Sequence, residues 1–172
     1  MRPLSTRHRF RDPRSTKFDF LVSVLVRCPG CAKTAHVVTA PAPAPAPEGG
    51  HDRGLFAARR LVCRSCGTAK HWSGRGVALH RDRHAPATDP YFGLPLWLQT
   101  ETRHGWVWAY NLEHLDLIRR FVQASLREGI PWHDHGRKMT VVARLPAWMQ
   151  HAKNRNEVLR AIDRIHASLV HT

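Results

Sequence analysis

The fold is decided by residues 28–66, "CPGCAKTAHVVTAPAPAPAPEGGHDRGLFAARRLVCRSC". Two Cys-x-x-Cys pairs, Cys28/Cys31 and Cys63/Cys66, lie on either side of an alternating Pro-Ala run. Zinc prefers four ligands at tetrahedral angles, and each pair can direct two sulfurs to one point. The pairs are 31 residues apart, and leaving out 41–54 reduces this to 17, within the roughly 15–20 of a plain four-cysteine site. We therefore interpret residues 41–54 as a flexible Pro/Ala/Gly loop inserted into one zinc ribbon.

Two other kinds of cysteine chemistry remain open. A thiol oxidoreductase needs a reactive thiolate, usually at a helix N-terminus, whereas strand-like runs flank both pairs here. Iron bound by four sulfurs would use the same geometry as zinc, so the spacing does not separate the two metals. Gly67 directly after the second pair suits a backbone with positive φ. Ala32 takes the equivalent place after the first pair, which makes that turn harder to predict.

Alternating apolar residues predict the strands of the ribbon, which we place at residues 18–80. The expected strands are 18–26, 35–39, 58–63 and 68–72. Each Cys-x-x-Cys pair then lies in the turn between two strands. The order strand, turn, strand, loop, strand, turn, strand is typical of a zinc ribbon.

The rest of the chain, residues 90–172, has an α+β pattern. Leu96 and Leu98 alternate before Gly105, and tryptophans alternate after it, which predicts a hairpin. Asn111 is a suitable N-cap for a helix over 112–128, whose apolar stripe ends at Leu126. Asn154 and Glu157 have capping-box spacing before a final helix. The expected fold class is α+β, with the Trp-rich hairpin packed against two helices.

The first 17 residues are basic and contain two prolines, so we expect a disordered tail. No run approaches the roughly 20 apolar residues that a membrane-spanning helix needs, and we expect no contact with a membrane. Four cysteines in two close pairs, without a secretory signal, are typical of metal ligands in a reducing compartment. The expected location is the cytoplasm.

The formal net charge is +14, of which residues 1–89 contribute +10. An excess of this size indicates an anionic partner such as nucleic acid or an acidic protein, although a GC-rich coding sequence also enriches arginine. Cations and an indole around the second Cys-x-x-Cys pair could bind phosphates and stack on an unpaired base. The candidate nucleic-acid-binding residues are Arg59, Arg60, Arg64, Lys70, Trp72 and Arg75.

The aromatic residues also have an alternative explanation. Trp72 could instead cover the junction between the ribbon and the second half. Trp97, Trp106 and Trp108 fall in the expected hairpin, where core packing is more common than base stacking.

The sequence does not predict an enzyme. It lacks a Walker loop, a Gly-x-Ser-x-Gly motif and a zinc-protease His-Glu pair. Four thiolates would leave no open position on the metal for a substrate. The "HDH" at 133–135 has no evident third ligand, and no small-molecule substrate is indicated.

Cys28, Cys31, Cys63, Cys66 and Gly67 together resemble a zinc ribbon of the type named after transcription factor IIB. The segments "DPYFGLPLWLQTETRHGWVWAYNLEHLDLIRRF" (89–121) and "RLPAWMQHAKNRNEVLRAIDRI" (144–165) are similar to small bacterial zinc-ribbon proteins, mostly of unassigned function. The resemblance covers roughly residues 20–170 without the Pro-Ala insertion. It implies a bacterial cytoplasmic protein whose two halves belong together.

The leading hypothesis is a non-enzymatic zinc-ribbon protein with one structural Zn²⁺. It would bind DNA or RNA, as an accessory to transcription, replication or repair. The alternative is a protein-interaction adaptor organised by the same zinc site, and a thiol oxidoreductase is the third hypothesis.

Overall fold

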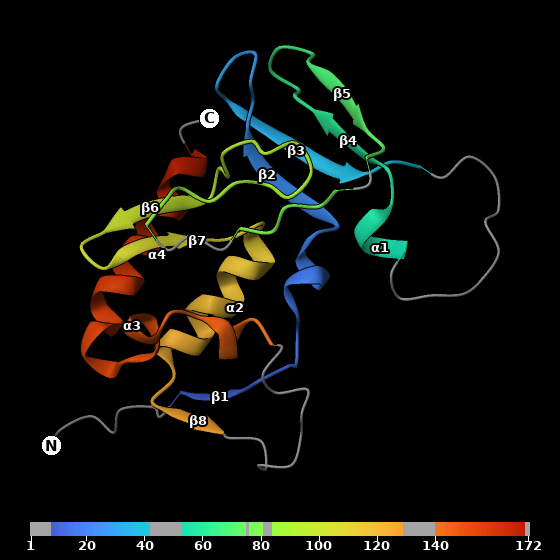
Figure 1. The fold of residues 1–172 in the computed structure, drawn as a ribbon. Coiled ribbons are helices and arrows are strands. Elements are labelled where there is room, and N and C mark those ends of the chain that lie inside the picture. Colours follow the sequence, from blue (N-terminus) through green and yellow to red (C-terminus); the bar gives the residue numbers. More distant parts are fainter. Residues whose placement is uncertain (1–7, 42–52, 75, 81–83, 129–139, 171–172) are drawn as a thin grey trace, which may run out of the picture.

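The computed structural model of the chain describes residues 8–41, 53–74, 76–80, 84–128 and 140–170 (Figure 1). The fold is α+β, as predicted, with antiparallel sheets and four α-helices in these residues. Of the loop insertion predicted at 41–54, residues 42–52 lie outside the described residues, as do Arg75 and the "HDH" segment. Arg53 and Gly54, predicted as the end of that loop, belong to a short helix instead. The helices are α1 (Arg53–Phe56), α2 (Leu112–Gln123), α3 (Ala147–Gln150) and α4 (Arg155–Val170).

A four-stranded antiparallel sheet forms the first half, in the order β2-β3-β4-β5. Its strands are β2 (Ser23–Arg27), β3 (Thr34–Thr39), β4 (Arg59–Val62) and β5 (Ala69–Trp72). The register pairs Val24 with Val37, and Val37 with Leu61, so these three side chains lie on one face. All three are fully buried. The predicted alternation of apolar residues therefore gives this sheet its core-facing side.

The predicted strand at 18–26 begins later than expected, at Ser23. Residues 17–20 form a 3-10 turn instead, because Thr16 and Asp19 cap it. The Thr16 N–H donates to the Asp19 carboxylate at 2.6 Å. The acid that interrupts the apolar run thus starts a helical turn and delays the strand.

The prediction of a disordered tail over 1–17 is wrong for the residues from 8 onward. Strand β1 (Arg9–Arg11) pairs in parallel with β8 (Leu126–Glu128), and Phe10 is buried between them and α2. The helix predicted over 112–128 ends at Gln123, because residues Leu126–Glu128 pair with β1 as a strand. Leu126, expected on its apolar stripe, is 40% exposed in β8.

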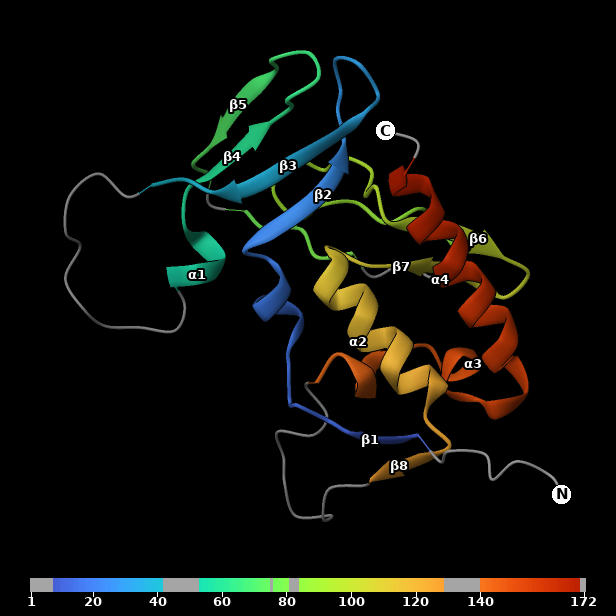
Figure 2. The same cartoon turned by 180° about the vertical axis from the view of Figure 1, so that it is seen from behind.

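The expected Trp-rich hairpin consists of β6 (Gln99–Thr102) and β7 (Gly105–Trp108). Helix α4 packs against β6 and α2, and the view from behind shows it crossing the hairpin (Figure 2). The final helix begins at Arg155, as the Asn154–Glu157 spacing predicts. Its residues Val158, Ile162 and Ile165 are buried.

The two halves share one continuous hydrophobic core. The free edge of β2 is covered by the second half: Leu25 donates its N–H to the Tyr110 carbonyl at 2.8 Å and accepts from the Trp97 N–H at 2.9 Å. Asn111 caps α2 as predicted, since its side-chain oxygen accepts from the His114 N–H. Its amide also donates to the Ser23 carbonyl at 3.1 Å. One asparagine therefore joins the start of α2 to the start of β2.

In both views the four-stranded sheet lies at one end of the molecule, and the β1–β8 pair lies at the other (Figures 1 and 2). Among the helices of the described residues, none has both the length and the apolar character required to cross a bilayer.

Candidate metal centre

The two Cys-x-x-Cys turns have the same backbone geometry. In the first, the Ala32 N–H donates to the Cys28 carbonyl at 2.9 Å, and in the second the Gly67 N–H donates to the Cys63 carbonyl at 3.0 Å. A second hydrogen bond closes each turn. The Cys28 N–H donates to the Lys33 carbonyl, and the Cys63 N–H donates to the Thr68 carbonyl. Ala32 has φ 60° and Gly67 has φ 74°. The first turn thus forms without a glycine after its second cysteine.

The four sulfurs converge on one point. All four ligand atoms lie within 4.8 Å of one another. The Cys28 and Cys66 sulfurs are 3.6 Å apart, as are those of Cys31 and Cys63. A tetrahedral zinc site with Zn–S bonds of about 2.3 Å places its sulfurs about 3.8 Å apart. The cluster therefore has the size and donor set of a four-thiolate metal site, and its short sulfur pairs join different turns.

The surroundings of the thiols favour thiolates at two positions. Burial opposes ionisation of Cys28, but N–H groups of Cys31 and Gly30 and the neighbouring thiols outweigh it and lower its pKa to about 6. The hydroxyl and the N–H of Thr68 lower the pKa of Cys66. These donors stabilise negative charge on sulfur, as the hydrogen bonds around a metal site do.

Cys31 behaves in the opposite way. The Lys33 N–H favours its thiolate, but burial and the three neighbouring thiols raise its pKa to about 12. Four sulfurs at this spacing cannot all ionise together unless a cation offsets their charge. A divalent ion bound at their centre supplies that charge, so these residues fit a structural metal ion.

The predicted nucleic-acid-binding residues do not form one surface. Arg59 is only 2% exposed, so its assignment to an exposed surface is wrong. Its guanidinium donates to the Leu21 carbonyl and the Thr39 hydroxyl at 2.8 and 2.7 Å, and also to the Gly54 carbonyl. Arg59 stacks over the Tyr91 ring, 4.5 Å from its centroid. Arg59 thus connects Thr39, before the insertion, with Gly54, its last residue.

Trp72 lies at the junction between the ribbon and the second half, as the alternative explanation predicts. Its indole is partly buried against the core and meets the Tyr91 ring edge-on at 4.9 Å. An alanine at Gly74 would bring its Cβ to 3.1 Å from the indole nitrogen, so the Gly74 backbone lies close against the ring. Trp72 therefore contributes to packing at this junction.

Arg60, Arg64 and Lys70 remain exposed on the β4–β5 hairpin. Arg60 lies opposite His71 in the register, whereas Lys70 lies opposite the buried Leu61. Alternate residues of a strand point to opposite faces. Arg60 and Lys70 therefore lie on opposite faces of the sheet, close to its outer edge.

Sequence analysis missed a group of aromatic residues and histidines around β7 and α2, centred on Trp108 and His114. His114 is four residues before Ile118 on the apolar stripe of α2. A histidine within that stripe was the available signal, because a buried imidazole needs hydrogen-bond partners.

Comparison of the chain with protein-family models, with curated proteins and with solved structures found no match. Membership of a zinc-ribbon family therefore stays a prediction from the cysteine motif. The cysteine cluster itself rests on the geometry described above.

Proposed function

We propose that this chain is a non-enzymatic zinc-ribbon protein that binds nucleic acid through the exposed cations of its β4–β5 hairpin. The observation that supports this most is the charge of the ribbon. Its described residues, 18–41, 53–74 and 76–80, contain seven Lys or Arg and a single acidic residue, Asp19. Four thiolates with one Zn²⁺ carry a charge of −2, so the ribbon keeps a positive excess after its metal site is counted.

Within the described part of the chain, the exposed cations of the β4–β5 hairpin have no acidic partner. Within the parts of the chain that the structure describes, the ion pairs involving Asp or Glu lie in the second half, for example Arg103 with Glu157 at 2.9 Å. None involves Arg60, Arg64 or Lys70. Unpaired arginines on a surface are suited to forked contacts with phosphate.

The proposed binding is independent of sequence. Phosphate contacts position a protein on nucleic acid, whereas specificity requires contacts with base edges or stacking. Trp72, the aromatic residue expected to stack, packs on Tyr91 instead. We therefore expect affinity to depend steeply on salt and weakly on base sequence. The metal has a structural role, because four cysteines fill its tetrahedral positions.

A salt titration of the metal-loaded protein against duplex DNA and RNA tests the proposal. Replacing Arg60, Arg64 and Lys70 by alanine removes three phosphate contacts, and the slope of log K against log salt should fall by about 2.7 on duplex DNA. The matched control replaces three exposed cations of the second half, Arg120, Lys153 and Arg160, and should leave the slope nearly unchanged.

No binding at low salt would refute nucleic-acid binding and favour the adaptor function. Equal effects of the two triple variants would refute the assignment to the β4–β5 hairpin. Elemental analysis of the purified protein should give one zinc per chain. Iron at that stoichiometry, or no metal together with a reducible Cys28–Cys31 disulfide, would refute the zinc assignment.

A further inference from the structure

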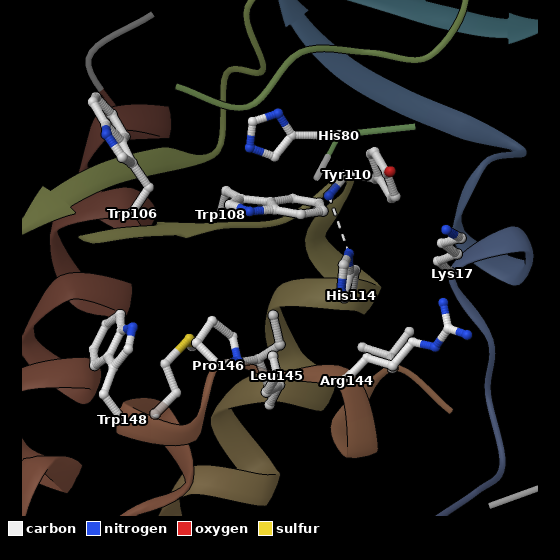
Figure 3. A pocket seen from close by; sticks show the side chains of 13 residues that line it. Lys17, His80, Trp106, Trp108, Tyr110, His114, Arg144, Leu145, Pro146 and Trp148 are labelled. Carbon is white, nitrogen blue, oxygen red and sulfur yellow. Dashed lines mark hydrogen bonds between the residues drawn. The ribbon is translucent and has the colours of Figure 1, made fainter. Parts of the chain in front are cut away.

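A cavity of about 380 Å³ lies between β7, α2 and residues 141–149 of the second half, and Lys17 and His80 also line it (Figure 3). Cavities that bind small molecules begin at about 300 Å³. Its lining is rich in aromatic rings: Trp106, Trp108, Tyr110, Trp148, His80 and His114. This site is separate from the cysteine cluster and from the cations of the β4–β5 hairpin.

His114 supplies a fixed hydrogen-bond donor to this cavity. The residue is 3% exposed, and its Nδ1 accepts from the Tyr110 N–H at 3.2 Å. An imidazole that accepts at Nδ1 carries its hydrogen on Nε2 when it is neutral. Burial lowers the pKa of His114 to about 3, so the ring stays neutral at physiological pH. The Nε2–H therefore suits an uncharged acceptor on a ligand, such as a ring nitrogen or a carbonyl.

His80 lines the cavity with its ring. Its Nε2 is buried, and it has no hydrogen-bond partner within the described part of the chain. Leaving such a nitrogen unpaired costs about 1–3 kcal/mol. The ring stands edge-on to Trp108, with the centroids 5.6 Å apart at 89°. The ring of His80 therefore lines the cavity, whereas its buried Nε2 is not placed to contact a ligand there.

Aromatic and apolar side chains form opposite walls of the cavity. His80 and His114 both meet the Trp108 indole at 89°. Leu145, Pro146 and Trp148 lie on the other side of the cavity from His80 in the close-up view (Figure 3). Aromatic side chains bind planar heteroaromatic rings by stacking, which is worth about 1–3 kcal/mol per ring.

One end of the cavity is positively charged. Lys17 and Arg144 both line it and lie near each other at the end beyond His114 (Figure 3). None of the lining residues that the structure describes is Asp or Glu. Both side chains also have a partner within the protein. An ammonium has three N–H groups and a guanidinium has five, so each keeps donors for an anionic group attached to a ring that lies beside Trp108.

We propose that this cavity binds a planar heteroaromatic ring that carries an anionic group, the chemistry of a nucleoside monophosphate. The ring lies beside Trp108 and accepts from the His114 Nε2–H, and the phosphate contacts Lys17 and Arg144. The nucleotide is either free or the unpaired end of a strand. This proposal does not depend on the proposed function of the ribbon, and it adds a small-molecule site that the sequence did not indicate.

Isothermal titration of the metal-loaded full chain with adenosine 5′-monophosphate tests the proposal, with adenosine and inorganic phosphate as partial ligands. We expect the monophosphate to bind at least tenfold more tightly than either part. No binding of the monophosphate at millimolar concentration would overturn the proposal, and so would equal affinity for adenosine.

Three variants test the roles of single residues. Arg144→Gln should weaken the monophosphate about tenfold and leave adenosine unchanged, whereas Arg160→Gln on the exposed side of α4 should change neither. His114→Asn keeps an acceptor for the Tyr110 N–H but removes the Nε2–H, and should weaken both ligands about tenfold. Trp108→Leu should remove most of the binding. If His114→Asn does not fold, the other two variants still decide, and unchanged affinity in both would overturn the proposal.

A short single strand with a 5′-phosphate distinguishes the two sources of the nucleotide. If the strand competes with the monophosphate and its competition is lost in Arg144→Gln, the site takes a strand end; if it does not compete, the site takes a free nucleotide. The alanine variant of Arg60, Arg64 and Lys70 should bind the monophosphate normally. Loss of duplex binding with intact monophosphate binding in that variant would separate the two proposals.

Discussion

Ala32 and Gly67 occupy equivalent positions after the second cysteine of each turn, and both have positive φ. Glycine adopts this conformation without a steric penalty, whereas a residue with a Cβ loses about 1 kcal/mol. The first turn therefore contains backbone strain that the second avoids. A structural zinc ion held by the four cysteines would contribute about 10–16 kcal/mol, enough to hold a strained turn in place.

Exchanging the two residue types measures this strain. Gly67→Ala should lower the free energy of unfolding by about 1 kcal/mol, and the cost is confined to the backbone because a Cβ there meets no atom within 4 Å. Ala32→Gly should raise it by up to about 1 kcal/mol, less the entropy that glycine adds to the unfolded chain. Urea denaturation with the metal kept saturating gives both values. Destabilisation by Ala32→Gly as large as that by Gly67→Ala would show that φ is not the cause.

Arg59 shows what a residue-by-residue analysis of charge overlooks. Its place in the alternation puts it on the same face of β4 as Leu61, which is fully buried. The positive charge of Arg59 suggested an exposed position, whereas the two-residue alternation along β4 indicated that its side chain faces the interior. The guanidinium is accommodated there because two carbonyls and a hydroxyl accept its hydrogens.

At the scale of elements, the β1–β8 pair joins the start of the chain to the second half. The Phe10 ring is 6% exposed and meets Phe121 edge-on at 5.3 Å. Next to it, the Thr140 hydroxyl donates to the Asp12 carboxylate at 2.8 Å. The short strand is therefore held by packing and side-chain bonds in addition to its ladder.

Phe10→Ala should lower the free energy of unfolding by about 3 kcal/mol, since it removes a buried aromatic ring. Phe18→Ala is the matched control, because Phe18 is 40% exposed and its loss should cost less than about 1 kcal/mol. Chemical denaturation of both variants gives the comparison. Equal losses would mean that β1 does not contribute to the stability of the fold.

The elements that could be predicted from the sequence are those with local patterns. Cysteine spacing gave the four-sulfur cluster, and alternation gave the strands β3, β4 and β5. Asn111 marked the start of α2. The β1–β8 pair could not be found in this way, because each strand has three residues and the two are more than 100 residues apart. The aromatic cavity was missed for a related reason: His80, Trp108 and Trp148 come from separate segments that only the tertiary fold brings together.

At the scale of the whole molecule, the metal site and the aromatic half are joined through β2. Cys28, directly after β2, provides one sulfur of the cluster, and Leu25 of β2 exchanges backbone hydrogen bonds with Tyr110 and Trp97. The buried residues of both halves form one cluster. Unfolding of the ribbon would therefore expose β2 and remove one side of the packing around the hairpin.

Removal of the metal should consequently unfold both halves in one transition. The binding free energy of structural zinc, about 10–16 kcal/mol, is as large as the total stability of a typical domain, about 5–15 kcal/mol. A chelator under reducing conditions should decrease the far-ultraviolet circular dichroism and shift the tryptophan fluorescence at the same chelator concentration, because most tryptophans lie in the second half. Cys66→Ser, which alters one exposed ligand, should respond at a lower chelator concentration, and added zinc should reverse the change in the unmodified chain. If the helices and the tryptophan signal survive chelation, the two halves fold independently and the continuous core does not couple them.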